Sequence, residues 1–348
     1  MKALRWYGRK DVRYEDAPEP FPEAGQIKAR IEYAGICGTD LREYASGPCM
    51  ISPAKAPITL GHEFSGRVVQ LGKGVKDSKI GDRVTGLGYW ACGECYFCKR
   101  MQYNICPNQG FSGLTENGCM AEYLVAPQYA FYNLPGSVSY EYAALVEPLA
   151  VGLHAVRKSE MRPGDTVAIV GDGTIGLSVL LMALAAGAAS VYIVSKHPGR
   201  AGIARKMGAD AAIDPGKEDP VKQVQLLTGG LGADVTFECV GNPDTAQMAV
   251  DIARRDGMAV MIGVFDRAGP FHFAGVVFGE KRIVGSSIYV REAEPVIALL
   301  ADRRIDPGLL ITSRVPLQEA VELGFEKLLK DKENNLKVLL KIPKKEDC

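Results

Sequence analysis

The chain has 348 residues, of which 47% are hydrophobic and 24% are charged, a composition typical of a soluble globular protein rather than a disordered or fibrous one. At roughly 150 residues per domain, this length predicts two domains. The 41 basic and 41 acidic residues give a formal net charge of zero, which argues against a nucleic acid or an anionic membrane surface as a partner.

The hydrophobic pattern indicates neither a membrane anchor nor a secretion signal. No apolar run approaches the ~18 residues of a spanning helix, and the N-terminal stretch MKALRWYGRKDVRYED lacks the apolar core of a signal peptide. We therefore expect a cytoplasmic protein with no membrane partner.

Short β-type runs separated by glycine and proline fill the first half of the chain. Examples are QIKARIEYAGI, SGRVVQLG and GDRVTGL. Runs of this length between turn residues predict a loop-rich, mainly antiparallel β domain over residues 1 to about 150.

Four residues with zinc-ligand chemistry stand in separate segments of this half, and they are Cys37, His62, Glu63 and Glu147. One thiol, one imidazole and two carboxylates suit zinc. Three such ligands leave one coordination position open, where an alcohol can be activated for hydride transfer to a nicotinamide ring. Each residue alone is weak support, since a lone cysteine or buried histidine usually belongs to the core. His62 is one of only four histidines and lies in a polar segment, which favours a functional role.

Nine cysteines need an explanation other than disulfides in a protein expected in a reducing compartment. Four of them follow the pattern C-x2-C-x2-C-x7-C, and they are Cys92, Cys95, Cys98 and Cys106. Two-residue spacers let thiolates converge on one tetrahedral ion, and four sulfur ligands leave no open position. This pattern predicts a structural zinc in a lobe over residues 90 to 107. The alternative, free thiols in a core, is disfavoured by the polar residues between them.

The sequence pattern changes after residue 163. PGDTVAIVGDG reads as a turn, an apolar strand and a glycine turn, and it precedes the apolar helix TIGLSVLLMALAAGA and the strand SVYIVS. The alternation continues to RIVGSS, which predicts a doubly wound parallel sheet over residues 155 to 286. The terminal run NNLKVLLKIP is predicted to be a strand that returns to the first domain's sheet.

The glycine turn GDGTIG fits the pattern G-x-G-x-x-G between a strand and a helix. We expect its residues to contact the phosphates of a dinucleotide at the helix N-terminus, and they are Gly171, Gly173, Thr174, Ile175 and Gly176. Gly173 would let the backbone approach the pyrophosphate, and Gly176 would let the helix pack on the strand. The alternative is a glycine turn that serves packing alone.

The stretch VYIVSKHPGR contains no carboxylate where an NAD-using unit has one at the end of its second strand. Ser195 stands at that position, where its hydroxyl would donate to the 2′-phosphate of NADP and would not repel it. Lys196 and Arg200 add positive charge nearby. We therefore predict a preference for NADP, with NAD as the alternative if these cations are ordinary surface charges.

Taken together, GICGTDL, GHEFSG, GDRV, the four-cysteine lobe, EPLAVGLHA and GDGTIG occur in an order that resembles zinc-dependent medium-chain alcohol dehydrogenases over essentially the whole chain. Within that superfamily the chain resembles the polyol branch of 2,3-butanediol, sorbitol and threonine dehydrogenases. The resemblance implies a GroES-like catalytic domain of residues 1–153 and 287–348, with a Rossmann domain of residues 154–286 inserted. It also implies a homodimer or homotetramer with contacts near RIVGSSIYV.

The same resemblance implies roles around the catalytic zinc. Cys37, His62 and Glu147 would hold the metal, while Glu63 would approach it or hold its water. Thr39 would accept the alcohol's proton and Asp40 would orient the imidazole; the alternatives are a turn residue and a helix cap. A histidine that serves the outer proton relay in many relatives is absent from DLREY.

The resemblance also suggests a substrate. The loop LREYASGPCMISP is similar to the butanediol-dehydrogenase form, which favours a small secondary alcohol or vicinal diol and its hydroxyketone. The alternatives are a sorbitol-like polyol or L-threonine. A zinc-binding nucleic-acid protein is disfavoured by the balanced charge, and a zinc-free quinone reductase by the zinc ligands. We expect two zinc ions per chain.

Overall fold

The computed structural model describes residues 1–343 and divides the chain into two compact units. One unit contains Met1–Glu147 and the residues from Ala293 onward, and the other contains Pro148–Glu292. The domain limits predicted at residues 153 and 286 therefore differ from these boundaries. Within residues 1–343, none of the helices combines the length and the apolar character that a bilayer crossing needs.

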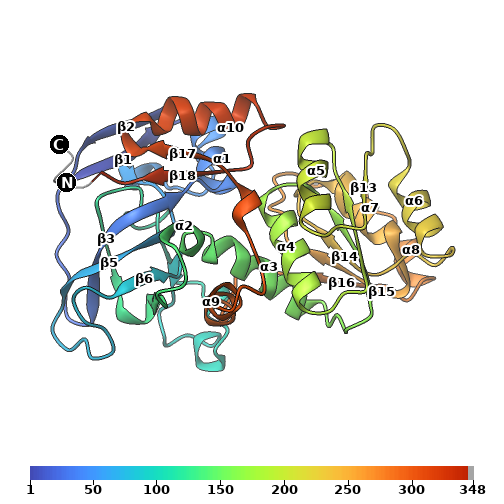
Figure 1. Cartoon of the computed structure of the whole chain (residues 1–348), viewed down its shortest axis with the longest axis horizontal. Coiled ribbons are helices and arrows are strands. Elements are labelled where there is room, and N and C mark those ends of the chain that lie inside the picture. The colour runs from blue at the N-terminus through green and yellow to red at the C-terminus, as the bar shows by residue number, and fades with distance from the viewer. Residues whose placement is uncertain (344–348) are drawn as a thin grey trace. The chain divides into compact units, whose positions relative to one another are not determined.

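The first unit is built on a seven-stranded, mainly antiparallel sheet (Figure 1). Its strands, in spatial order, are β10 (Phe131–Asn133), β6 (Arg83–Gly86), β5 (Glu63–Leu71), β3 (Gln26–Gly35), β18 (Lys337–Lys341) and β17 (Ile311–Pro316), with β9 (Tyr123–Pro127) also paired to β3. β18 pairs antiparallel with β3, which confirms the predicted return of the last strand to the first sheet. Val338, Leu339 and Leu340 are fully buried there, and this burial explains the apolar run.

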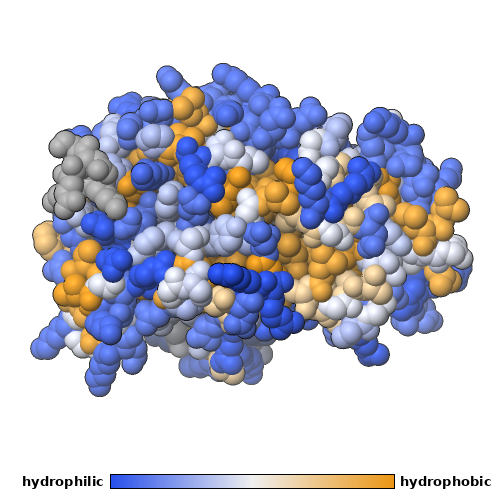
Figure 2. Space-filling view, viewed as in Figure 1, coloured by the Kyte–Doolittle hydropathy of each residue, from blue (hydrophilic) through white to orange (hydrophobic). Residues whose placement is uncertain are grey.

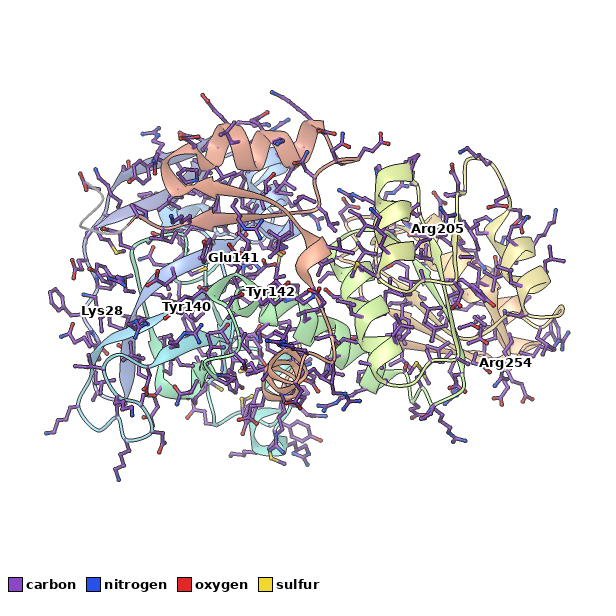
Figure 3. All side chains as sticks on the ribbon, in the orientation of Figure 1. Lys28, Tyr140, Glu141, Tyr142, Arg205 and Arg254 are labelled. Carbon is purple, nitrogen blue, oxygen red and sulfur yellow. The ribbon has the colours of Figure 1, made fainter. Side chains whose placement is uncertain are left out.

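Smaller elements complete this unit. The short strands are β1 (Lys2–Gly8), β2 (Asp11–Asp16), β4 (Ile58–Thr59), β7 (Tyr89–Trp90) and β8 (Gly110–Phe111). The helices are α1 (Gly38–Ser46), α2 (Tyr140–Ala143), α9 (Ala293–Ala301) and α10 (Lys327–Lys330), and α3 (Val146–Lys158) begins here. Glu141 and Tyr142 of α2 are labelled in Figure 3. The Glu141 carboxylate accepts two hydrogen bonds from Arg314, and the Tyr142 hydroxyl donates one to Asp306, each at 2.8 Å. These bonds tie the returning segment to α2.

The second unit is a six-stranded parallel sheet with helices along the chain between its strands (Figure 1). The strand order is β13 (Ala211–Ile213), β12 (Ser190–Val194), β11 (Thr166–Val170), β14 (Ala233–Glu238), β15 (Ala253–Met261) and β16 (Arg282–Gly285). The connecting helices are α4 (Thr174–Ala185), α5 (Pro198–Lys206), α6 (Pro220–Leu227), α7 (Pro243–Ile252) and α8 (Phe273–Val277). This order confirms the predicted doubly wound fold, whose switch point lies between β11 and β14.

Burial follows from this architecture. Val167, Ala168, Ile169 and Val170 of β11 are all at most 1% exposed, as expected for a central parallel strand covered on both faces. Hydrophilic residues cover much of the molecular face shown in Figure 2, with hydrophobic residues between them.

Candidate active site

Cys37, His62 and Glu63 meet at one end of the β3–β5 strand pair. Because β3 and β5 run antiparallel with Gly35 opposite Glu63, the residues just after β3 and just before β5 lie close together. One potential ligand atom from each of the three residues lies within 4.8 Å of the others. The pairing register thus joins two segments that are well separated in the sequence.

The chemistry of these side chains fits a metal ion. His62 is 2% exposed, and its Nδ1 has no hydrogen-bond partner among the described residues. A buried polar nitrogen without a partner is costly, and a metal would satisfy it. Burial, followed by the charge of Glu63, raises the pKa of the Cys37 thiol. A bound zinc ion reverses that tendency, because it is ligated by the thiolate.

Glu63 forms a buried ion pair that the sequence analysis missed. The Lys337 ammonium, 1% exposed, donates to both Glu63 carboxylate oxygens at 2.6 and 2.7 Å and to the Ile36 carbonyl at 3.0 Å. Lys337 is the first residue of the strand KVLLK, and its place directly before the apolar run VLL was the only signal in the sequence. Because both oxygens already accept hydrogen bonds from Lys337, Glu63 is less suited than a free carboxylate to ligate a metal.

Glu147 lies in the first turn of α3 and is 6% exposed. Burial raises its pKa to about 7; the charge of Glu63 acts in the same direction, and His62 and Lys337 oppose it. Its carboxylate does not belong to the group of ligand atoms that meet within 4.8 Å. The structure therefore places Glu147 in the electrostatic surroundings of His62 and Glu63 without bringing it into the same cluster.

Thr39 and Asp40 both lie in the first turn of α1. The Cys37 thiol lies 3.8 Å from the Thr39 hydroxyl, which puts that hydroxyl beside a candidate ligand. Asp40 is fully buried, and its Oδ2 accepts the Cys37 backbone N–H at 2.9 Å. Its Oδ1 has no partner among the described residues. The structure thus shows the capping role for Asp40, with no hydrogen bond to the His62 ring.

The four lobe cysteines come together as a cluster. Their Sγ–Sγ distances are 3.5 Å for Cys92–Cys106 and Cys95–Cys98, and 3.9 Å for Cys92–Cys98 and Cys95–Cys106. Four sulfurs around zinc at ~2.3 Å lie roughly 3.8 Å apart, so these distances fit a tetrahedral site. The backbone N–H groups of Cys92 and Cys98 also point at cluster sulfurs, at 3.5 Å.

The glycine turn leaves open space at the start of α4. Gly171 has φ +118°, a left-handed conformation that favours glycine, and a Cβ on Gly176 would lie 2.0 Å from the Gly171 carbonyl oxygen. Gly173 is the N-cap of α4 and has no side chain that could cap the helix, and a Cβ there would meet nothing within 4 Å. The start of α4, at Thr174 and Ile175, is thus open beside Gly173 to an anion such as a phosphate.

Of the three residues from which the sequence predicted a preference for NADP, Ser195 and Arg200 lie against Asp172, whereas Lys196 does not contact it in the described structure. The Ser195 side chain is buried and donates to Asp172 Oδ2 at 2.9 Å, while Lys196 is exposed. Arg200 lies 3.5 Å from Asp172 Oδ1. Asp172 belongs to the glycine turn, so a carboxylate is present at the end of β12 although the strand itself has none; its only signal in the sequence was the acid in GDGTIG.

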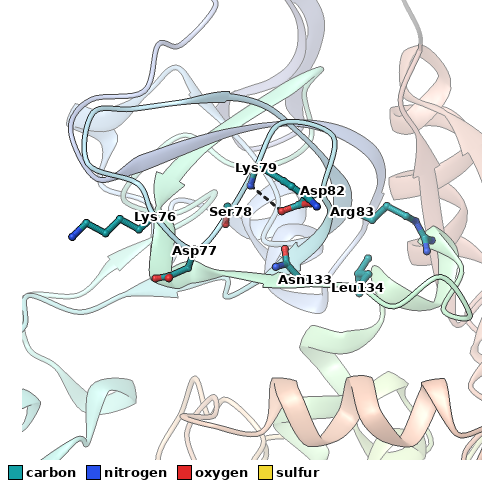
Figure 4. Close-up of a pocket in the computed structure, with 8 residues that line it drawn as sticks. All are labelled: Lys76, Asp77, Ser78, Lys79, Asp82, Arg83, Asn133 and Leu134. Atoms are coloured by element: carbon teal, nitrogen blue, oxygen red, sulfur yellow. Dashed lines mark hydrogen bonds between the residues drawn. The ribbon is translucent and has the colours of Figure 1, made fainter.

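A separate hollow of about 460 Å³ is shown in Figure 4. Its lining residues are Lys76, Asp77, Ser78, Lys79, Asp82, Arg83, Asn133 and Leu134. The Lys79 backbone N–H donates to Asp82 at 2.9 Å, drawn as the dashed line. The lining is close to charge-balanced and contains none of the candidate site residues.

Known proteins match nearly the whole chain. A family model described as alcohol dehydrogenase GroES-like domain matches residues 23–136, and one described as zinc-binding dehydrogenase matches residues 174–302. The chain is 36% identical to (R,R)-butanediol dehydrogenase of Bacillus subtilis, covering 98% of this chain and 99% of that protein. It is 35% identical to sorbitol dehydrogenase of Halalkalibacterium halodurans, covering 92% and 94%.

A solved structure supports the same grouping. It is described as a zinc-binding dehydrogenase from Sinorhizobium meliloti 1021 bound to NADP, and it matches with a TM-score of 0.87 at 31% identity over 98% of both chains. Sequence and structure thus point to the same set of relatives.

Proposed function

Because this chain belongs to the zinc-dependent medium-chain alcohol dehydrogenases, in the polyol branch, and is an oxidoreductase, we propose that it transfers hydride reversibly between a nicotinamide cofactor and a small vicinal diol or secondary alcohol such as 2,3-butanediol. The observation that carries this proposal is the meeting of Cys37, His62 and Glu63, whose electrostatic surroundings include the buried Glu147. A sorbitol-like polyol is the second candidate, favoured by the likeness to sorbitol dehydrogenase.

We propose that Cys37, His62 and Glu147 hold the catalytic zinc. Glu63 contributes negative charge nearby, and Lys337 fixes its position through both carboxylate oxygens. Buried carboxylates and a thiol together favour a bound cation, since uncompensated buried charge is costly. When bound, zinc supplies Lewis-acid chemistry that favours loss of the alcohol's proton.

The protein's own groups would then manage that proton and position the substrate. The Thr39 hydroxyl, beside Cys37, accepts the alcohol's proton and passes its own onward. Glu43, fully buried in α1, accepts backbone N–H groups of Cys49 and Ile51 and so fixes the loop that follows the helix. This loop belongs to the segment that is similar to the butanediol-dehydrogenase form.

The glycine turn and α4 would hold the cofactor's pyrophosphate, supported by the open space at Gly173. The preference for NADP, inferred from Ser195, Lys196 and Arg200, stays a prediction. The hydrogen bond from Ser195 to Asp172 weighs against it.

We also propose that the chain forms a homodimer or homotetramer. β16 is one of the two edge strands of the parallel sheet, and Ile283 on it is 41% exposed. An unpaired edge with an apolar side chain suits pairing with a second copy.

A substrate panel tests the proposed activity. We expect kcat/KM for 2,3-butanediol to exceed that for sorbitol and for L-threonine by at least about tenfold, because pocket contacts that distinguish substrates are worth roughly 1–3 kcal/mol. Cofactor reduction is followed at 340 nm with each alcohol in turn. A higher kcat/KM for sorbitol would assign the chain to its second candidate function, and no turnover of any diol or polyol would reject both.

Replacing Cys95 with serine tests the structural zinc. Metal analysis is expected to give two zinc ions per chain in the parent protein and one in Cys95→Ser. The variant's lobe should be digested faster by protease, because metal binding at such a site is coupled to local folding. Cys49→Ser serves as the control, since Cys49 is exposed and belongs to neither cluster. A parent protein that binds no zinc when freshly purified would end the assignment of both sites.

A further inference from the structure

Asp172 lies within a set of hydrogen-bond donors at the end of β12. Besides the bond from Ser195, its Oδ2 accepts the His197 backbone N–H at 3.0 Å and lies 2.9 Å from the His197 ring Nδ1. Arg200 approaches the other carboxylate oxygen. Asp172 is 6% exposed and Ser195 is 2% exposed, so this is a buried contact and not a surface pairing.

These donors form a site for one anion. His197 is the N-cap of α5, a helix of nine residues, and Arg200 lies in its first turn. Helix N-termini favour negative charge, and hydrogen bonds to a charged group are stronger than neutral ones. Burial raises the pKa of Asp172, but bonds from His197 and Ser195 outweigh burial and lower the pKa overall. The carboxylate is therefore charged near neutral pH.

The end of β12 is also where bound NAD and NADP would differ. In a doubly wound fold the adenosine ribose lies beside the end of the second strand, which here is β12. NADP differs from NAD only by the phosphate on that ribose. A 2′-phosphate there would need donors that Asp172 already occupies, and it would be repelled by the carboxylate.

We propose that Asp172 is the residue that selects the cofactor: its carboxylate stands in for the acid missing from β12 and disfavours the 2′-phosphate of NADP. The inference rests on the proposed function, because it takes a nicotinamide dinucleotide as the ligand. It opposes the NADP preference predicted from the sequence, in which Ser195 was counted as an available donor. The cofactor affinities of the parent protein and of its Asp172 variants decide between the two.

The test is Asp172→Asn, which removes the charge and keeps the size of the side chain. NADH and NADPH are titrated into the zinc-loaded protein without substrate, and the dissociation constants are read from cofactor fluorescence. The parent is expected to bind NADH more tightly. In Asp172→Asn the ratio of the two constants should shift toward NADPH by at least about tenfold, since a like charge adjacent to the phosphate is removed. Adenosine 2′,5′-bisphosphate should likewise compete better in the variant.

Asp210→Asn is the matched control. Asp210 Oδ2 accepts the Val191 backbone N–H at 2.7 Å near the start of β12, so its loss alters the same strand at the other end. It should leave the ratio unchanged. Asp172→Ser, checked by circular dichroism together with Asp172→Asn, provides a second uncharged variant if asparagine disturbs the fold.

The outcomes separate this inference from the proposed function. A parent that binds NADPH more tightly, or a ratio unchanged in both Asp172 variants, would overturn the role of Asp172 and leave the dehydrogenase proposal intact. A parent that binds neither nucleotide would reject the proposed cofactor site and this inference with it.

Discussion

Replacing Cys37 with serine, or His62 with alanine, is expected to abolish alcohol oxidation while the protein stays folded. Both residues belong to the cluster whose ligand atoms lie within 4.8 Å of one another. Loss of a ligand to a Lewis-acid metal removes several kcal/mol of transition-state stabilisation, so kcat/KM should fall roughly 10³-fold or more. An open catalytic site contributes less to the framework than a closed structural one, so the unfolding midpoint should change little.

The measurement combines steady-state kinetics with zinc content and circular dichroism. Each variant should lose one zinc ion and keep the other, and Cys49→Ser should keep both ions. Retention of more than about a tenth of the parent's kcat/KM in Cys37→Ser would remove that thiol from the metal site. Equal losses of thermal stability in Cys37→Ser and Cys95→Ser would contradict the distinction between an open and a closed site.

The features predicted correctly from the sequence are those encoded over short distances. The strands β11 and β12 were visible as apolar runs, and the glycine turn GDGTIG identified the β11–α4 junction. The cluster of lobe cysteines could be predicted from their spacing, because short spacers leave little freedom in where the thiols can lie.

The features missed depend on contacts that spacing does not encode. Lys337 and Glu63 are 274 positions apart, and their pairing follows only from β18 lying against β3 in the same sheet as β5. Asp172 and Ser195 are 23 positions apart, and they meet because β11 and β12 are parallel neighbours whose ends lie together. The sequence of β12 alone therefore does not reveal the carboxylate of Asp172, which the adjacent turn supplies.

Asp40 illustrates a different limit. Its two readings, as a helix cap and as a group that orients the imidazole, require the same residue type at the same place. The hydrogen bond from the Cys37 N–H supports the first. Local sequence cannot separate these readings, because the direction of a short side chain depends on what packs around it.

The second large effect is expected from Lys337→Met, which should lower the free energy of unfolding by about 3–5 kcal/mol. Methionine fills much of the lysine's volume but leaves the Glu63 carboxylate, itself 1% exposed, buried without its ammonium partner. Equilibrium unfolding in urea measures the change. Zinc content is measured in parallel, so that a metal lost with the ion pair is detected.

The control for this prediction is Lys10→Met. Lys10 pairs with Glu326 at 2.7 Å, close to the 2.6 Å of the buried pair, but its side chain is 46% exposed. Exposed ion pairs are worth about 0–1 kcal/mol, so the control should lose at most that amount. If both lysine variants lose the same small amount, the buried pair contributes no more than a surface pair.

A double variant separates the unpaired charge from lost packing. If the damage in Lys337→Met comes from a stranded carboxylate, adding Glu63→Gln should restore part of the stability, because a neutral amide is far less costly to bury than a charge. If it comes from packing, the second substitution should add to the loss. The activity of the double variant gives a second, independent test, because Glu63 lies beside Cys37 and His62. If the double variant regains stability while its kcat/KM stays low, the Lys337–Glu63 pair has two roles. It holds the sheet together, and it also sets the charge at the candidate zinc site.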